Sequence, residues 1–279
     1  MKICICGLGL IGGSFAKAIK ANTAHKVYGL DRSGEVCAAA LESGAIDEIA
    51  TAKTLGDCDL VILALYPAAA IEFVRAHLAD FREDAILLDT CGIKTEVCKE
   101  IGELTKDTSL RFIGGHPMAG IEKSGFAASF ATLFCGASMI LCTETCGDEG
   151  AIETVSELCR ALGFARITPS TARRHDEIIA YTSQLAHVIS SAYIQSKLAT
   201  AHAGFSAGSF KDMTRVARLN PDMWTELFFE NRDNLSSVIG ELIGHLSQYK
   251  DALDRGDRAA MHTLLSTGDA RKKKSETLQ

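Results

Sequence analysis

Residues 7–12 read Gly-Leu-Gly-Leu-Ile-Gly, and they decide how the first half of the chain is interpreted. They follow directly on the apolar run Lys2–Cys6, which predicts a β-strand, and they open a helical pattern over Ile11–Lys20. A strand, a glycine-rich turn and a helix in this order form the arrangement with which many proteins hold a dinucleotide. The stretch therefore predicts a Rossmann-type domain.

Each glycine of this stretch has a separate physical task. Gly7 permits the tight turn, Gly9 lets the backbone approach a pyrophosphate, and Gly12 lets helix and strand pack closely. The helix N-terminus then presents free N–H groups and a partial positive charge to the phosphates. From this stretch, the expected cofactor-binding residues are Gly7, Gly9, Leu10, Ile11 and Gly12. The alternative is a tight turn that binds nothing.

The second predicted strand, Lys26–Leu30, ends at Asp31, about 20 residues beyond Gly12, as this motif requires. A carboxylate at this place accepts hydrogen bonds from ribose hydroxyls and repels a 2′-phosphate, so NAD is expected as the cofactor. Arg32 keeps NADP open, because an arginine beside this position can hold that phosphate. For Asp31 the competing interpretation is a helix N-cap.

The remaining pattern indicates two domains. Apolar runs predict further strands over Asp59–Ala64, Ala85–Asp89, Arg111–Gly114, Ser138–Cys142 and Ala165–Thr168. Helical stretches such as Asp148–Leu162 lie between them, which indicates a mostly parallel sheet covered by helices. Beyond Pro169 the predicted elements are helices: Ala172–Thr200, Ser209–Arg218, Pro221–Tyr249 and Ala259–Leu265. We expect a Rossmann domain over 1–168 and an all-helical domain over 169–279, with the basic run Arg271–Lys274 as a solvated terminus.

Composition excludes several classes of protein. The 279 residues are 47% hydrophobic and 23% charged, which is typical of a globular protein rather than a disordered one. The formal net charge of −6 offers no global attraction for nucleic acid or an anionic membrane, and no apolar run approaches the ~18 residues of a transmembrane helix. The ten cysteines follow no signal peptide, so we expect reduced thiols, no metal and a cytoplasmic location. Any anionic substrate must then be held by a few local cations.

Four further segments carry polar residues suited to chemistry. In chain order they are Asp89-Thr90-Cys91-Gly92-Ile93-Lys94, the block from Gly114 to Gly125 that begins Gly-Gly-His-Pro-Met-Ala-Gly, the pair formed by Arg174-His175-Asp176 and Ser183-Gln184-Leu185-Ala186-His187, and the block Lys211-Asp212-Met213-Thr214-Arg215 with Trp224 beyond it.

These segments, in this order after the glycine stretch, resemble the prephenate/arogenate dehydrogenase family from Met1 to about residue 265. The resemblance implies a Rossmann domain followed by a helical domain that forms a homodimer, and oxidative decarboxylation of a cyclohexadienol with NAD. It matches the family's catalytic histidine to His116. It further implies a substrate site made of Arg215 as the anchor, with Lys211, His187 and Glu122.

Two departures from the family pattern affect the geometry of the site. Many relatives have Gly-Ser where this chain has Cys91-Gly92, so a serine that orients the catalytic histidine is missing, and Thr90 is the proposed substitute. Relatives also carry a histidine where this chain has Gln184. Neither departure removes the base or the anchor.

The chemistry explains why such residues are needed. A neutral histidine can take the proton of the ring hydroxyl, because its reference pKa of about 6.5 lies near neutrality. Lys211 and Arg215 stand four apart, so on a helix they share one face, where an arginine fork can hold a carboxylate. The competing interpretation is a solvated basic face. Trp224 is interpreted as core or interface packing rather than ligand contact.

Alternatives differ in testable ways. Another β-hydroxyacid-type dehydrogenase would lack the Gly-Gly-His-Pro block, and a catalytically inactive dinucleotide-binding sensor would bind NADH without turnover. An arogenate site would need a carboxylate near His187, and Thr182–Ala186 offers none, although Asp176 and Glu177 lie about two turns earlier. This favours prephenate.

Overall fold

The computed structural model describes residues 1–277 and contains one eight-stranded sheet with the order β3-β2-β1-β4-β5-β6-β7-β8. Neighbouring strands run parallel except β6 and β7, which are antiparallel. The strands are β1 (Lys2–Cys6), β2 (Lys26–Leu30), β3 (Glu48–Ile49), β4 (Leu60–Leu63), β5 (Ile86–Asp89), β6 (Arg111–Pro117), β7 (Ser138–Cys142) and β8 (Arg166–Ser170). This confirms the Rossmann-type, mostly parallel sheet. The two-residue β3 was not predicted, because so short a run carries no periodicity.

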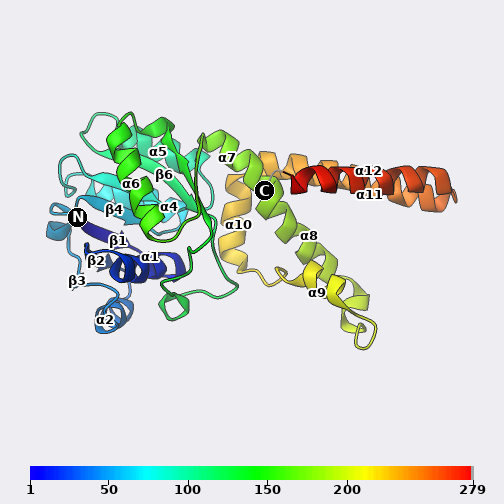
Figure 1. Cartoon of the computed structure of the whole chain (residues 1–279), viewed down its shortest axis with the longest axis horizontal. Helices are drawn as coiled ribbons and strands as arrows, with labels where there is room; N and C mark the ends of the chain where they lie inside the picture. Colours follow the sequence, from blue (N-terminus) through cyan, green and yellow to red (C-terminus); the bar gives the residue numbers. More distant parts are fainter. Residues whose placement is uncertain (278–279) are drawn as a thin grey trace. The chain divides into compact units, whose positions relative to one another are not determined.

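Helices cover both faces of the sheet (Figure 1). On one face the buried core includes residues of α1 (Leu10–Asn22), α2 (Gly34–Glu42) and α6 (Glu149–Ala161), and on the other those of α3 (Ala52–Leu55), α4 (Pro67–His77) and α5 (Thr95–Thr105). The alternation along β1 shows both faces, since Ile3 and Ile5 join the first core while Cys4 and Cys6 join the second. The Cys4-x-Cys6 pair is thus core, as parallel strands buried on both sides require.

Beyond β8 the chain is helical. One continuous rod consists of α7 (Ala172–Ile179), a π-helical turn η3 (Ala180–Gln184) and α8 (Leu185–Ile194). The predicted helix to residue 200 is too long, because the α-helix ends at Ile194 and only a 3₁₀ turn, η4 (Lys197–Thr200), follows. Two short helices come next, α9 (Gly208–Thr214) and α10 (Pro221–Glu230). π-turns inside helices are rare and frequently mark functional sites.

A single helix over 221–249 was predicted, and this is wrong. Asn231 leaves the helical conformation, with φ −116° and ψ 25°, and its side-chain amide donates to the main-chain oxygen of Asp176 and to Gln184 Oε1. The interruption follows from these long-range hydrogen bonds, which no local pattern reveals.

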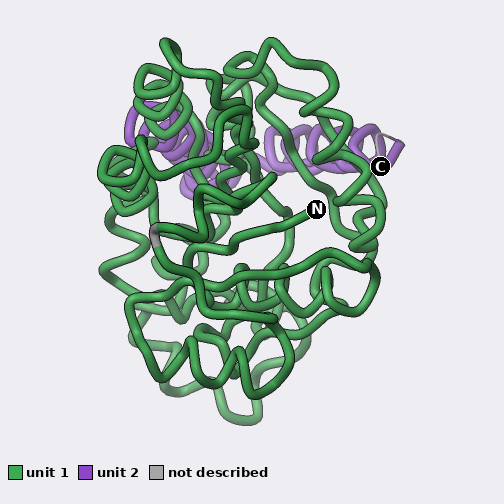
Figure 2. The backbone as a smooth tube through the Cα atoms, turned by 90° about the vertical axis from the view of Figure 1, so that its left-hand side faces the viewer, with its two compact units in different colours: residues 1–231 green, residues 232–279 purple. Residues whose placement is uncertain are grey.

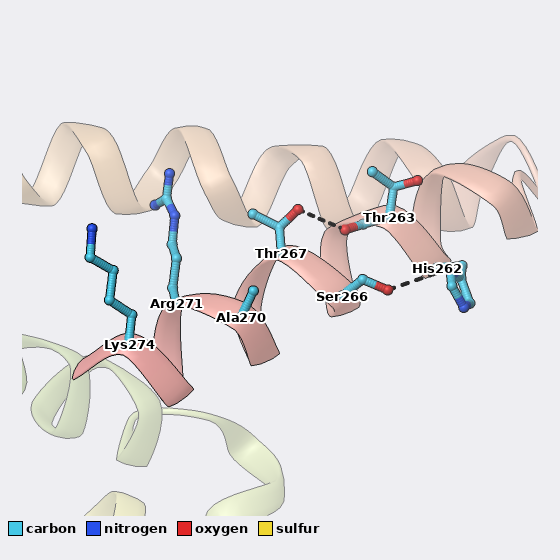
Figure 3. A pocket seen from close by; sticks show the side chains of 7 residues that line it. All are labelled: His262, Thr263, Ser266, Thr267, Ala270, Arg271 and Lys274. Atoms are coloured by element: carbon cyan, nitrogen blue, oxygen red, sulfur yellow. Dashed lines mark hydrogen bonds between the residues drawn. The ribbon is translucent and has the colours of Figure 1, made fainter. Parts of the chain in front are cut away.

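The described chain divides by its contacts into two compact units, 1–231 and 232–279 (Figure 2). The second unit holds α11 (Arg232–Asp254) and α12 (Arg258–Glu276), and residues 278–279 of the expected helical domain lie outside the described residues. The basic run Arg271–Lys274 continues α12, and its residues are exposed, as expected for a solvated segment. Arg271 and Lys274 line an open hollow on that helix together with hydroxyl side chains such as Thr267 (Figure 3).

Within residues 1–277 no helix combines the length and the apolar character needed to cross a membrane.

Candidate active site

The glycine loop, residues 7–12, has the geometry of a phosphate cradle. Gly7 adopts φ +89°, a conformation that side chains rarely allow, and a Cβ on Gly12 would lie only 1.8 Å from the Gly7 carbonyl oxygen. Gly9 caps α1 without any side-chain hydrogen bond, and the first turn of that helix, which includes Leu10 and Ile11, carries no acidic residue. A Cβ on Gly9 would meet no atom within 4 Å, so this loop leaves room beside a positive helix end, which fits a dinucleotide pyrophosphate.

Asp31 follows β2, and its carboxylate forms hydrogen bonds that connect the glycine loop to the chain after β2. Its Oδ2 accepts from the Leu8 N–H at 2.8 Å and its Oδ1 from the Ser33 N–H at 2.9 Å. Ser33, not Asp31, is the N-cap of α2, so the N-cap interpretation of Asp31 does not hold. Arg32 is exposed beside it. A carboxylate with lone pairs remaining on both oxygens beside the glycine loop fits the ribose of NAD.

His116 lies on β6 and not, as the sequence suggested, in a loop. Its Nδ1 is 2.8 Å from Nε2 of His175 on α7, and Nδ1 of His175 is 2.7 Å from Asp176 Oδ1. The side chains of His175 and Asp176 are 0% and 2% exposed, whereas His116 is half-buried. A line of hydrogen bonds therefore runs from a buried carboxylate to the ring of the candidate base.

This line sets the tautomer of His116. The Asp176 carboxylate can only accept, so Nδ1–H of His175 donates to it and the Nε2 of a neutral His175 is an acceptor. Nδ1–H of His116 then donates to His175, and the lone pair of His116 lies on Nε2. That nitrogen is the one nearest Gly92, where a Cβ would lie 4.0 Å from it. The arrangement leaves His116 with a free proton-accepting atom.

The surroundings keep both rings neutral. Burial lowers the pKa of His116 well below its ordinary value, and the adjacent His175 and Lys94 lower it further. Burial also lowers the pKa of His175, although the hydrogen bond to Asp176 acts in the opposite direction. Burial alone would raise the pKa of Asp176, but hydrogen bonds from His175 and from Thr95 outweigh it, and the pKa is lowered. At neutral pH the site thus combines a carboxylate with neutral imidazoles.

Asp176 is itself held by the start of α5. The main-chain N–H groups of Lys94 and Thr95 each donate to one of its oxygens at 2.8 Å. Below them, Lys94 and Asp89 form an ion pair whose side chains are both 0% exposed. We call His116, His175, Asp176, Lys94 and Asp89 the base cluster.

The two glycines before His116 serve the fold rather than a ligand. A Cβ on Gly115 would lie 2.5 Å from the main-chain oxygen of Asp89, and one on Gly114 would lie 2.5 Å from Cys98 Sγ. The sequence suggested that the pair lets backbone approach a ligand. Instead, it lets β6 lie close against β5 and α5, which brings His116 to the base cluster.

The departures from the family pattern also have structural counterparts. The Thr90 hydroxyl donates to the Leu63 carbonyl at 3.2 Å, so its hydrogen goes to β4, whereas His116 is held through His175. Gln184 is buried and joins two elements, since its Nε2 donates to the Leu227 carbonyl at 2.8 Å and its Oε1 accepts from Asn231. Gln184 thus anchors α10 on the α7–α8 rod.

The expected substrate residues form a second group. Arg215, at the C-cap of α9, pairs with Glu122 at 2.7 Å, and their side chains are 66% and 51% exposed. The ring of His187 on α8 lies 4.0 Å from that of Trp224, centroid to centroid. Burial lowers the pKa of His187, and the charge of Arg215 adds to this. Lys211 is exposed one helical turn before Arg215.

Within this group, Nδ1 of His187 donates to the Ser183 carbonyl at 2.9 Å, which leaves Nε2 of a neutral ring as its acceptor. Trp224, interpreted from the sequence as core or interface packing, packs against the rings of His187 and Phe228. A partly exposed arginine, a neutral histidine and an aromatic wall form a surface suited to a carboxylate on a ring-bearing ligand.

The sequence indicated no role for His175, Lys94 or Asp89, and it suggested Asp176 only as a distant carboxylate for arogenate. The adjacent His175-Asp176 pair was the available signal, because a carboxylate beside a histidine commonly orients the imidazole. Nothing local indicates that Lys94 is buried, since lysine is almost never fully buried without a partner, and the partner must be known first.

Comparison with known families matches nearly the whole described chain. Residues 15–168 match the family model described as prephenate dehydrogenase, nucleotide-binding domain, and residues 171–267 match that of the prephenate dehydrogenase dimerization domain. The first match begins just after the glycine loop, so the assignment of that loop rests on its own geometry.

Individual relatives agree with these matches. The chain is 33% identical to a cyclohexadienyl dehydrogenase of Zymomonas mobilis over 91% of this chain and 89% of the relative. It is 29% identical to a prephenate dehydrogenase of Bacillus subtilis over 91% of this chain and 71% of that one.

Solved structures show the same fold. The crystal structure of Synechocystis arogenate dehydrogenase superimposes with a TM-score of 0.84 at 25% identity, over 99% of this chain and 100% of the other. A prephenate dehydrogenase from A. aeolicus, in complex with hydroxyphenyl propionate and NAD+, does so with 0.84 at 26% identity, over 100% and 99%.

Proposed function

The chain belongs to the prephenate dehydrogenase family of NAD-dependent oxidoreductases, and we propose that it converts prephenate to 4-hydroxyphenylpyruvate in tyrosine biosynthesis. The observation that carries this proposal is the ring of His116, whose Nε2 is left as a proton acceptor by the hydrogen bonds to His175 and Asp176. A base of this kind is what oxidation of a ring hydroxyl requires.

In the proposed reaction His116 takes the proton of the C4 hydroxyl on Nε2. NAD+, when bound, supplies the acceptor for the hydride that leaves C4. The bond between C1 and its carboxylate breaks and CO₂ leaves. The electron pair of that bond moves through the ring to the C4 oxygen, the ring becomes aromatic, and the oxygen takes a proton back, which gives the hydroxyl group of the product. Because His116 starts neutral, the proton has a destination without prior deprotonation at physiological pH.

The residues of this chain divide the binding work. The N–H groups at the start of α1, from Gly9 to Ile11, would hold the pyrophosphate, and Asp31 the adenosine ribose. Arg215 would hold a substrate carboxylate through its guanidinium fork. Lys211 and His187 would complete that end of the site, and Glu122 would accompany Arg215 near the entrance.

Three broader statements belong to the same proposal. We assign the domains as 1–168 and 169–279, supported by the two family matches, which meet between residues 168 and 171. We propose a homodimer, supported by the dimerization-domain match and by exposed apolar side chains there, among them Leu198, Phe205 and Phe229. We place the enzyme in the cytoplasm, where the ten free cysteines of the described chain stay reduced.

Arogenate is the second candidate substrate. The solved arogenate dehydrogenase has the same fold over nearly the full chain. The partners found for His187 are the Ser183 carbonyl, the Trp224 ring and the Arg215 charge, a setting for a neutral or anionic arm rather than an ammonium group. This supports prephenate.

The test is an assay of the purified protein with prephenate and with arogenate, each with NAD+ and NADP+, following nicotinamide absorbance. We expect the highest kcat/KM for prephenate with NAD+. Higher kcat/KM with arogenate would reassign the substrate, and NADH binding without turnover of either compound would indicate a sensor.

A further inference from the structure

The least expected side chain near His116 is Lys94, at the start of α5. Its side chain is 0% exposed, as is that of its partner Asp89, although lysine and aspartate are rarely buried completely. Burial alone would lower the pKa of Lys94, but the Asp89 carboxylate outweighs it and the pKa is raised, so the ammonium stays charged. An ion pair kept out of water is costly to a fold and needs some other reason to be there.

The first link from Lys94 leads to the backbone of β6. Lys94 Nζ donates to the carbonyl oxygen of Gly115 at 2.7 Å. The N–H of the same glycine donates to Asp89 Oδ1 at 3.1 Å. The ion pair therefore forms hydrogen bonds with both polar main-chain groups of Gly115, the residue that precedes His116.

The second link leads to the imidazole ring. The main-chain N–H of Lys94 donates to Asp176 Oδ1, and the same oxygen accepts from Nδ1 of His175, whose Nε2 accepts from His116. The backbone before His116 and the ring of His116 are thus both held from one residue. Together with the peptide bond between Gly115 and His116, these hydrogen bonds close a ring: Lys94, Gly115, His116, His175, Asp176 and back to Lys94.

We propose that the side chain of Lys94 is a positioning group for His116: through Gly115 and Asp89 it sets where the base stands, while its main-chain N–H holds the Asp176 that orients His175. The proposal rests on the function proposed above and deepens it. Lys94 itself reaches neither a substrate nor a cofactor in this assignment. It acts through the ring of hydrogen bonds and through its charge.

The charge of Lys94 faces groups on every element packed around it. These are Asp89, Cys91, Cys98, His116, His175, Asp176 and Glu230. A nearby positive charge lowers the pKa of each of these groups, and Lys94 lowers the pKa of both imidazoles. Removing the charge should therefore make His116 easier to protonate.

The experiment compares Lys94→Met with Lys99→Met in the full-length enzyme. Lys99 lies on the same helix with a 68% exposed side chain, so it is a matched control with no part in the ring. Because Lys94→Met leaves Asp89 buried and unpaired and threatens folding, the double variant Lys94→Met/Asp89→Asn is made in parallel. Readouts are kcat, both KM values, circular dichroism, and the titration and tautomer of His116 by ¹⁵N-histidine NMR, with His116→Asn to assign the signal.

We expect the Lys94 variants to lose about 10- to 100-fold in kcat, the range for a misplaced catalytic group, with little change in either KM. The His116 titration should move to higher pH, whereas its Nδ1–H tautomer should stay dominant, because these variants keep the main-chain N–H of Lys94 that holds Asp176. Lys99→Met should match the wild type in all readouts.

A folded Lys94 variant with wild-type kcat and wild-type His116 titration would overturn the proposal. So would a parallel loss of kcat and of both binding affinities with an unmoved titration, since that pattern means general loosening of the fold. If the wild type oxidises neither prephenate nor arogenate, the proposed function fails, whereas the NMR titration still decides whether Lys94 positions His116.

Discussion

The glycine loop and the base cluster lie at the carboxyl ends of strands of the same sheet, with β4 between β1 and β5, yet they are built in opposite ways. The loop consists of consecutive residues, 7–12, and Asp31 joins it through a hydrogen bond to Leu8. The base cluster draws on β5, β6 and the start of α5 and α7, and Lys94 and Asp176 meet across 82 positions of sequence.

The two regions also use different chemistry. The loop works through backbone N–H groups that any sequence of suitable shape provides, so glycines mark it. The base cluster works through buried charges and imidazoles that must form hydrogen bonds with one another, because burying a polar group without a partner costs free energy. A change in the loop should therefore affect cofactor binding, whereas a change in the cluster should affect the chemical step.

The substitution His116→Asn should distinguish the roles of the two regions most clearly. Asparagine keeps a hydrogen bond to His175 but cannot accept the proton, so kcat should fall by about 10²–10⁴ while NAD+ affinity, carried by the loop, stays nearly intact. Steady-state kinetics and NAD+ titration measure both.

The pH profile adds a second criterion. Since the pKa of His116 is lowered, its neutral form persists to lower pH, and the acidic limb of kcat/KM should lie below the ordinary histidine value of about 6.5. His187→Asn is the control and should keep this limb. A near-normal kcat with the same limb in His116→Asn would transfer the role of base to His187.

Asp176→Asn tests whether the cluster acts as a unit. The amide can present N–H to His175, which would reverse the hydrogen bonds and leave a proton on Nε2 of His116. By analogy with the serine-protease aspartate, we expect a loss of about 10- to 10³-fold in kcat with the KM for NAD+ unchanged. Unaltered kcat would mean that the tautomer of His116 is set some other way.

Arg215→Ala addresses the substrate end of the site. A charged hydrogen bond contributes roughly 1.5–3 kcal/mol, so the KM for prephenate should rise about 10- to 150-fold with kcat less affected. Glu122→Gln removes the partner of Arg215 while keeping its shape and serves as the comparison. If KM stays the same in Arg215→Ala, another cation such as Lys211 holds the substrate.

Asp31→Ser tests the cofactor preference at the glycine loop. It removes the charge that repels a 2′-phosphate and weakens the bond to Leu8 N–H, so the preference for NAD+ over NADP+ should narrow by roughly 10-fold in kcat/KM. Arg32→Ser is the matched control. Equal use of both cofactors by the wild type, lost in Arg32→Ser, would assign the discrimination to Arg32.

The smallest effect concerns Glu230, which faces the base cluster from α10. Burial, with the charges of Glu226 and Asp176, raises its pKa to about 7, and its Oε2 is buried with no hydrogen-bond partner among the described residues. A carboxyl group with a raised folded-state pKa contributes stability below its ordinary value of about 4.3, and this is lost as pH rises through about 7.

The free energy of unfolding of Glu230→Gln should therefore exceed that of the wild type by more at pH 8 than at pH 5. We expect this difference to be about 1–2 kcal/mol after allowance for solvent screening of a half-buried group. Urea unfolding at both pH values measures it, with the exposed Glu83→Gln as control. Equal stability of Glu230→Gln and wild type at pH 8 would show that Glu230 is better solvated than its surroundings suggest.

Much of the fold followed from local patterns. The strands around Lys2–Cys6, the amphipathic helix before Gly163 and the Rossmann class were confirmed, because apolar periodicity and glycine turns act over a few residues. The helix break at Asn231 was missed, since it depends on partners at Asp176 and Gln184. The site roles of His116 and Arg215 stay predictions until tested.

The sequence by itself determined the class of fold, and it predicted the dinucleotide loop and, through the family resemblance, the candidate base, because these depend on patterns and motifs of consecutive residues. Only the tertiary structure decided that His116 stands on a strand and that His175 and Asp176 set its tautomer. The physical reason is that burial and hydrogen-bond partners are properties of neighbours in space. Lys94 appears in the sequence as an ordinary charged residue, and only the folded chain places it beside Asp89, out of water.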